Sequence, residues 1–226
     1  FYKEHTDEHD LIKNSFESLI LNSKRAAGIR EAIKSGCDVA VLDDGFQDYS
    51  IKKNLNIVCF NQNQLIGNGL VLPAGPLRES LDSLTNADII VVNGQRDKNF
   101  EEKILKINSD LKIFYSRYKA ENLNEFKDKR LFALAGIGNP ENFFQLIENN
   151  NLIIEKKFIF PDHYKFSKSE IQNIISEAER CSCEIVMTEK DYFKIKDFNL
   201  KNINYLKVSL VLDEQENLFS MVKEII

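Results

Sequence analysis

Two acidic side chains followed by a glycine form the sharpest candidate site for chemistry in this sequence. Asp43 and Asp44 come directly after an apolar run, 37–42, that is typical of a buried strand. Ligands of open α/β sheets bind at the carboxyl ends of strands. A carboxylate placed there can hold Mg²⁺ directly or through water. The alternative is a plain polar turn, since Asp and Gly favour turns in any case.

A loop rich in glycine and proline is the second candidate. Within residues 67–79, three glycines and two prolines fall in ten positions and make a stiff, irregular loop. Such a loop lets the backbone approach a ligand closely, and Arg78 could clamp a phosphate with its planar guanidinium. The GxxxxGK[ST] motif of nucleotide-binding loops occurs nowhere in the chain. A surface loop with a solvated pair of Arg78 and Glu79 is the alternative.

A histidine beside an aspartate is the third candidate. His163 follows Asp162 after an apolar run and a proline, and the chain has only three histidines. A histidine in such a place can transfer a proton or stabilise charge. The plainer alternative is a loop histidine that is hydrogen-bonded to its neighbours.

Two further clusters are weaker candidates. Asp7 and Glu8 lie between His5 and His9, where a metal site is conceivable but solvated polar residues near a chain end are favoured. Lys190 follows a later apolar run. A strand-to-helix capping turn with a solvated lysine is favoured there over a mechanistic role.

Strands and helices alternate in the pattern of apolar residues. Strands are predicted at 37–42, 56–60, 87–92, 111–115, 130–135, 152–160, 184–187 and 203–208. Helices are predicted at 23–35, 100–108, after Asn139-Pro140, at 167–180 and at 214–226. This alternation indicates an α/β fold with a mostly parallel sheet and flanking helices. The polar stretch 119–129 is the most plausible boundary between a domain of residues 1–124 and a domain of residues 125–226.

Composition narrows the class of protein. The chain has 226 residues, 43% of them hydrophobic and 29% charged, which suits one large or two small globular domains. A net charge of −5 argues against a nucleic-acid binder. No apolar stretch approaches 18 residues, so no spanning helix is expected. The four cysteines are expected to be free thiols in a reducing compartment.

Six segments in order resemble the tetraacyldisaccharide 4′-kinase family, the lipid A 4′-kinases of Gram-negative bacteria. The DDGFQ and GNGxLLPAGPLRE motifs of that family resemble 43–47 and 67–79, and four shorter matches follow at 91–94, 135–140 (AGIGNP), 160–164 (FPDHY) and 188–191 (TEKD). The resemblance implies a P-loop-kinase-like part, truncated before its P-loop and spanning 1–124, and a smaller α/β domain, 125–226. It implies transfer of the γ-phosphate of ATP, with Mg²⁺, to the 4′-hydroxyl of an acylated glucosamine disaccharide 1-phosphate.

The family resemblance also implies roles for individual residues. Asp44, assisted by Asp43, matches the acidic pair that would bind Mg²⁺ and the nucleotide. Gln47 matches a site glutamine expected to contact nucleotide and substrate. Arg78 and Glu79 match the family's RE pair, near phosphate and substrate.

Proton transfer is assigned to two residues on the same basis. Asp7 corresponds to the family's aspartate that removes the proton of the attacking hydroxyl, and His163 to the histidine that supports it. Thr6 and His9 replace the family's Gly and Pro around Asp7. The sequence also departs from the family at Asp48, where the family usually has His.

The resemblance places the protein at the cytoplasmic face of the bacterial inner membrane, as a peripheral protein. The family's P-loop and its apolar membrane-contacting helix are expected upstream of Phe1, so the chain as given is expected to bind ATP weakly and turn over poorly. Two alternatives stay open. One is a truncated, non-catalytic remnant of such a kinase, and the other is a different α/β sugar phosphotransferase with two aspartates at its metal.

Overall fold

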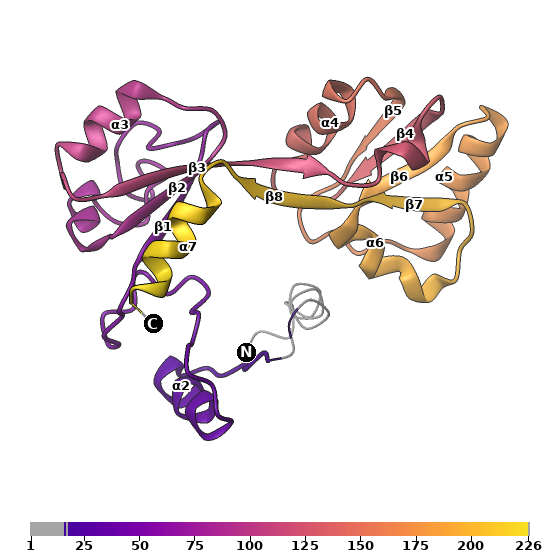
Figure 1. The fold of residues 1–226 in the computed structure, drawn as a ribbon. Helices are drawn as coiled ribbons and strands as arrows, with labels where there is room; N and C mark the ends of the chain where they lie inside the picture. Colours follow the sequence, from indigo (N-terminus) through magenta and orange to yellow (C-terminus); the bar gives the residue numbers. More distant parts are fainter. Residues whose placement is uncertain (1–15, 17, 226) are drawn as a thin grey trace. The chain divides into compact units, whose positions relative to one another are not determined.

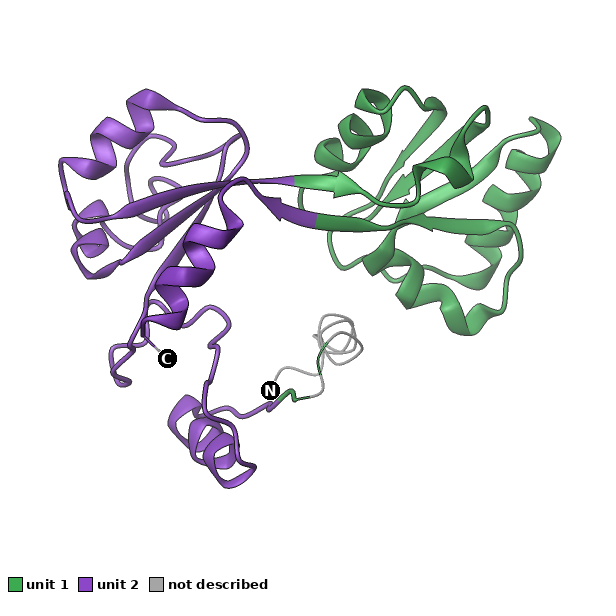
Figure 2. Cartoon of the chain, in the orientation of Figure 1, with its two compact units in different colours: residues 1–19, 118–209 green, residues 20–117, 210–226 purple. Residues whose placement is uncertain are grey.

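The computed structural model describes residue 16 and residues 18–225. The chain falls into two compact units, which Figure 2 shows in different colours. Unit 1 comprises residues 1–19 and 118–209, and unit 2 comprises residues 20–117 and 210–226. Each is built around a four-stranded sheet (Figure 1). Within the described residues, no helix is both long and apolar enough to cross a membrane.

The sheet of unit 2 has the strand order β1-β2-β3-β8. Strand β2 (Ile89–Asn93) lies between β1 (Ile57–Asn61) and β3 (Lys112–Ala120) and is parallel to both. The other elements are α2 (Arg25–Lys34), η1 (Leu81–Asn86), α3 (Lys98–Leu105), β8 (Val208–Leu212) and α7 (Gln215–Lys223).

Both faces of strand β2 are covered. Ile90 and Val92 pack in one cluster with Phe100 and Ile104 of α3. Ile89 points to the opposite face and packs with residues of α7. Because alternate side chains of a strand point to opposite faces, a strand covered on both sides must be apolar throughout. This explains why the run at 87–92 shows no polar alternation.

The sheet of unit 1 is parallel throughout, in the order β5-β4-β6-β7. Its strands are β4 (Arg130–Ala135), β5 (Ile153–Ile159), β6 (Glu184–Thr188) and β7 (Ile203–Leu206). Its helices are η2 (Leu123–Phe126), α4 (Pro140–Asn149), α5 (Lys168–Arg180), α6 (Glu189–Ile195) and η3 (Lys196–Phe198). One core cluster joins the sheet to α5 and α6, and a second joins it to α4.

The structure confirms the α/β class and most of the predicted strands. One prediction is wrong: residues 37–42 form no strand and are not buried, with Val39 46% and Val41 91% exposed. An apolar run becomes a strand only when a neighbour bonds its N–H and C=O groups. Among the described strands none pairs with this run, and β1 is an edge of its sheet.

A smaller difference concerns helix α4. Asn139 stands at its N-cap, but the Asn139 side chain makes no capping hydrogen bond.

The division into units differs from the expected boundary between 1–124 and 125–226. The last residues return to unit 2, because β8 lies next to β3 in its sheet. Leu218 of α7 then packs against Ile89 and Phe114. The sequence pattern predicted helix α7 but did not predict that this helix packs on the sheet of unit 2.

A buried carboxylate fastens the turn after β4. Asp191, at 0% exposure, accepts hydrogen bonds from the Gly136 N–H at 2.7 Å and from the Thr188 hydroxyl at 2.7 Å. The Lys194 ammonium lies 2.8 Å from its other oxygen. A Cβ on Gly136 would come within 3.1 Å of that carboxylate, so the close approach favours glycine there. Strands β4 and β6 are thereby joined at their carboxyl ends.

Replacing this carboxylate should destabilise unit 1. Asp191→Ala leaves a buried lysine side chain, 7% exposed, and a backbone N–H without their acceptor. We expect a loss of about 3 kcal/mol in the free energy of unfolding, measured by urea denaturation. The exposed Asp197 provides the matched control, and Asp197→Ala should change stability little. An equal effect of the two substitutions would contradict the assigned role of Asp191.

Candidate functional site

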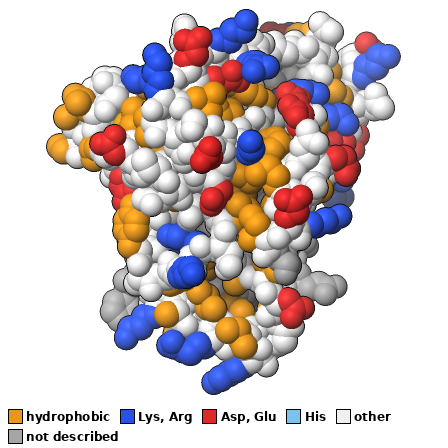
Figure 3. Space-filling model, turned by 60° about the vertical axis from the view of Figure 1, so that its left-hand side comes forward, with side chains coloured by type: hydrophobic (Ala, Val, Ile, Leu, Met, Phe, Trp, Pro, Cys, Tyr) orange, Lys and Arg blue, Asp and Glu red, His pale blue; other side chains and the backbone are white. Residues whose placement is uncertain are grey.

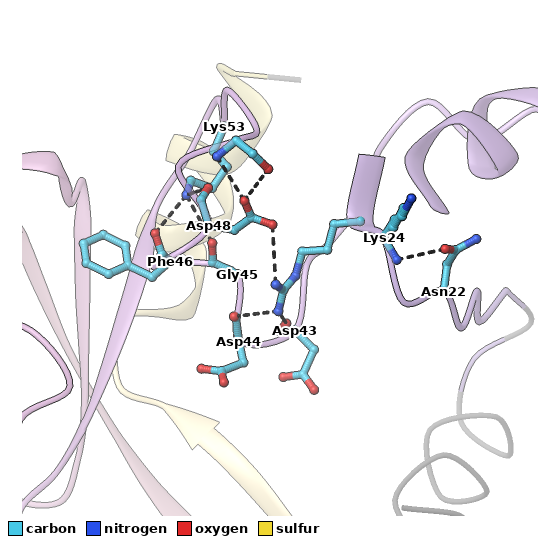
Figure 4. Close-up of polar contacts among 10 residues, drawn as sticks. Asn22, Lys24, Asp43, Asp44, Gly45, Phe46, Asp48 and Lys53 are labelled. Carbon is cyan, nitrogen blue, oxygen red and sulfur yellow. Dashed lines mark hydrogen bonds and ion pairs between the residues drawn. The ribbon is translucent and has the colours of Figure 1, made fainter. Parts of the chain in front are cut away.

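The acidic turn at residues 43–48 is irregular backbone anchored by its own side chains. Phe46 packs against the core cluster of β2 and α3. Gly45 is buried, and a Cβ there would lie 2.7 Å from Leu42, so only glycine fits without a shift. Asp44 has a left-handed backbone with φ 50°, which aspartate tolerates better than most residues. The Asp43 and Asp44 carboxylates point to the same side of the turn (Figure 4).

An ion pair joins this turn to the glycine- and proline-rich loop. Arg78 Nη1 lies 2.5 and 2.6 Å from the two carboxylate oxygens of Asp44, 34 residues away in the chain. Hydrogen bonding to Asp44, and then its charge, raise the pKa of Arg78. Both side chains are more than half exposed, so the pair is open to exchange with ligands from solvent. Two motifs separated in sequence thus form one surface.

Arg25 reaches the same turn, and sequence reasoning missed it. Its Nη2 donates to the carbonyl oxygens of Asp43 at 3.2 Å and Asp44 at 2.9 Å. Its Nη1 lies 3.5 Å from Asp48 Oδ2 (Figure 4). Arg25 is the first residue of α2, and nothing in the pattern of that amphipathic helix distinguishes it from other solvent-facing charges.

Asp48 is held by two groups. Its carboxylate accepts from the Ser50 hydroxyl at 2.5 Å and the Ser50 N–H at 3.0 Å, and it pairs with Arg25. These contacts, the Ser50 hydroxyl first, lower the pKa of Asp48. At the position where the resembled family usually has His, this chain has an anion with a cation as its partner.

The charged side chains surround an open hollow of about 450 Å³. It is lined by Arg25, Asp44, Gln47, Asp48 and Arg78. Guanidinium groups bind phosphate in a planar fork, and carboxylates bind hard cations. Glu79, next to the lining residues, accepts a hydrogen bond from the Tyr49 hydroxyl at 2.8 Å and raises the pKa of that phenol.

The described residues offer no complete protein cage for a metal. No group of three or more His, Cys, Asp or Glu is placed to hold an ion among them. Mg²⁺ commonly binds through one or two carboxylates and completes its shell with water and phosphate oxygens. Asp43 and Asp44 fit that arrangement, in which water and phosphate supply the remaining ligands.

Overlapping this hollow, unit 2 also has a wide trough whose lining mixes apolar with polar side chains and includes Asp44, Gln47 and Arg78. It has a volume of about 1310 Å³ and is lined in part by the run 37–42 and by β1. Figure 3 shows hydrophobic side chains gathered on one face of the molecule among charged ones. The run predicted as a buried strand is therefore part of an exposed apolar surface.

In unit 1, three of the motif segments meet at the carboxyl edge of the sheet. Strand β4 lies between β5 and β6, so the strand order reverses at its end, which is where open α/β sheets bind ligands. The loops that begin at Gly136 and Phe160 follow β4 and β5, and helix α6 begins at Glu189 directly after β6. Gly138 faces Asp162, since a Cβ there would lie 3.4 Å from the carboxylate.

His163 lies in this group of loops. Its backbone is left-handed, with φ 58°, and its N–H donates to Asp162 Oδ1 at 3.0 Å. Its Nε2 is 3.7 Å from Asp162 Oδ2. Lys190 Nζ lies 3.5 Å from the other oxygen of the same carboxylate. The capping turn at Thr188 is confirmed, but Lys190 is an ion-paired residue, only 19% exposed, and not the solvated lysine expected.

The predicted site residues thus fall into separate groups. Asp43, Asp44, Gln47, Arg78 and Glu79 belong to unit 2, and His163 belongs to unit 1. Asp7 lies outside the described residues.

A parallel α/β sheet, an acidic turn and arginines around one hollow are features of α/β phosphotransferases. Comparison with known families identifies the family within this class. The model of the family described as "Tetraacyldisaccharide-1-P 4'-kinase" (LpxK) matches residues 2–226. The chain belongs to this family.

Individual relatives agree with the family match. The tetraacyldisaccharide 4′-kinase of Pelagibacter ubique is 40% identical over 222 residues, covering 96% of this chain and 70% of the relative. That of Haemophilus influenzae is 31% identical and covers 93% of this chain and 61% of the relative. The chain therefore spans between about three fifths and seven tenths of these two relatives.

A solved structure shows the same fold. LpxK from Aquifex aeolicus, in complex with ATP, superposes with a TM-score of 0.62 and 23% sequence identity. The match covers 88% of this chain and 61% of that one.

The lowered pKa of Asp48 predicts a pH-dependent contribution to stability. A carboxyl whose pKa is lower in the folded than in the unfolded state stabilises the fold above its unfolded value, about 3.9, and loses that effect as the pH falls through the folded pKa. Asp48→Asn should therefore lower the melting temperature at pH 7 and have a smaller effect near pH 3. The exposed Asp38 serves as the control, and Asp38→Asn should show no such trend. An Asp48→Asn effect that is independent of pH would contradict this assignment.

Proposed function

We propose that this chain is part of an ATP-dependent kinase that phosphorylates the 4′-hydroxyl of a tetraacylated glucosamine disaccharide 1-phosphate in lipid A biosynthesis. The observation that carries the proposal is the pairing of Arg78 with Asp44 across the charged hollow. It brings an anion-binding group and a metal-binding group of two family motifs to one place. The family membership supplies the reaction and the acceptor.

The residues of unit 2 would bind the reacting phosphates. Asp44, with Asp43 beside it, would hold Mg²⁺ together with phosphate oxygens and water. Bound there, the ion would neutralise charge on the phosphates. Arg78 would bind a phosphate once its guanidinium leaves Asp44, and Gln47 would contact nucleotide and substrate from the same hollow. Glu79, fixed by Tyr49, would lie on the substrate side.

Proton removal from the acceptor hydroxyl would fall to two other residues. Asp7 would take the proton, and His163 would support its carboxylate. His163 is itself held by Asp162, which Lys190 also contacts. A general base of this kind contributes a factor of about 10²–10⁴ to the rate.

We further propose a peripheral position at the cytoplasmic face of the inner membrane, because the acceptor carries acyl chains.

Two other functions predicted from the sequence remain distinguishable by experiment. A soluble-sugar phosphotransferase would prefer a deacylated disaccharide phosphate, and the family match does not favour it. A non-catalytic remnant would transfer phosphate to neither acceptor. The decisive assay supplies γ-labelled ATP and Mg²⁺ with the acylated or the deacylated acceptor. Label on the acylated acceptor alone is the expected result.

The metal-side assignment predicts a large loss of rate. Asp44→Asn keeps the shape of the side chain and removes its charge, so we expect kcat/KM to fall about 100-fold or more. Asp110→Asn, at an exposed position of the same unit that lines neither the hollow nor the trough, should retain the wild-type rate. A wild-type rate for Asp44→Asn would remove Asp44 from the metal site.

The proton-transfer assignment makes a separate prediction. His163→Gln should lower kcat about 10²-fold or more at pH 7 while the KM for ATP changes little. Lys165→Gln, an exposed neighbour on the same loop, is the matched control. Equal rates in the two variants would show that His163 supports no proton transfer.

A further inference from the structure

Lys53 is bonded to the acidic turn through all three of its side-chain N–H groups. Its Nζ lies 3.1 Å from the carbonyl oxygen of Gly45, 2.9 Å from that of Phe46 and 2.8 Å from that of Asp48 (Figure 4). An ammonium group has three donors and no acceptor. Each donor therefore has one carbonyl, and the side chain is partly buried in making these bonds.

The turn depends on such bonds because regular structure does not hold it. Among the described residues, one backbone–backbone hydrogen bond joins members of the turn, from the Asp48 N–H to the Gly45 carbonyl at 3.2 Å. Arg25 bonds the carbonyls of Asp43 and Asp44. Two cations thus bond five carbonyl oxygens of a six-residue segment.

The two cations hold different parts of the turn. Arg25 lines the hollow together with Asp44 and Gln47, so its guanidinium is open to ligands there. Lys53 does not line this hollow, although it lines the overlapping trough, and its three hydrogen bonds all go to backbone carbonyl oxygens. Its bonds hold the peptide units that follow Gly45, Phe46 and Asp48, so the segment is fixed directly before Gln47 and again one residue after it.

We propose that Lys53 is a positioning residue of the site: it fixes the backbone at 45–48 so that Gln47 and Asp44 face the hollow. The ligand it serves, ATP with Mg²⁺, rests on the proposed function. A compact ammonium suits three converging carbonyls better than a planar guanidinium does. Loss of the ammonium leaves three carbonyls to water and lets the turn take other conformations.

Amide hydrogen exchange of the full chain tests the effect on the turn. Lys53→Met should speed exchange in peptides covering 43–50 about 10-fold, while β2 and β3 exchange as in the wild type. Lys53→Arg retains a cation and should recover part of the protection. Lys52→Met, at an exposed neighbouring lysine, is the matched control and should change nothing.

Calorimetric titration with Mg·ATP tests the effect on the ligand. We expect affinity about 10-fold lower in Lys53→Met, partly recovered in Lys53→Arg and unchanged in Lys52→Met. Three results would overturn the proposal. They are wild-type exchange of the turn in Lys53→Met, faster exchange spread evenly over unit 2, and unchanged ATP affinity in a variant whose turn exchanges faster.

The two proposals fail separately. If the complete protein that contains this chain neither binds ATP nor transfers phosphate, the proposed function fails and the exchange measurement alone decides the role of Lys53. If the wild type is an active kinase and Lys53→Met matches it in exchange and affinity, the role of Lys53 fails and the proposed function stands.

Discussion

Backbone groups outside the sheets have no neighbouring strand to bond with, and they must find partners elsewhere. In unit 2 the partners are cations, because Arg25 and Lys53 donate to the carbonyl oxygens of the acidic turn. In unit 1 the partner is an anion, because Asp191 accepts from Gly136 at the end of β4. The charged groups that satisfy the backbone are the same groups that fix the candidate ligand-binding loops.

The positions of most strands along the chain could be predicted because parallel sheets covered on both faces need unbroken apolar runs. The runs at 87–92 and 130–135 became β2 and β4 for that reason. The run 37–42 has the same pattern but no described strand beside it. A run of apolar residues indicates that a segment can be buried. It does not indicate whether a neighbouring strand is present to pair with it. The same limit explains why the sequence did not place 210–226 in unit 2.

The residues of the hollow could be singled out from the sequence where motif and chemistry agree, as at Asp44 and Arg78, and their roles stay predictions. The pairing of Asp44 with Arg78 could not be predicted, because it joins residues 34 apart through loops whose path the sequence does not specify. Arg25 and Lys53 resemble ordinary surface charges in sequence, and only the folded turn shows which carbonyls they meet. Lys190 was predicted as solvated because its partner, Asp162, follows a different strand.

The ion pair between Asp44 and Arg78 limits what can bind in the hollow. A cation that takes Asp44 leaves Arg78 without its anion, and a phosphate that takes Arg78 leaves Asp44 without its cation. Each exchange alone loses the attraction within this exposed pair, which is worth about 1 kcal/mol or less. A ligand that brings both charges, as a metal-bound polyphosphate does, replaces the pair and leaves neither group unpaired. The geometry therefore gives a modest preference, of about 1 kcal/mol or less, to binding of the metal and the phosphate together.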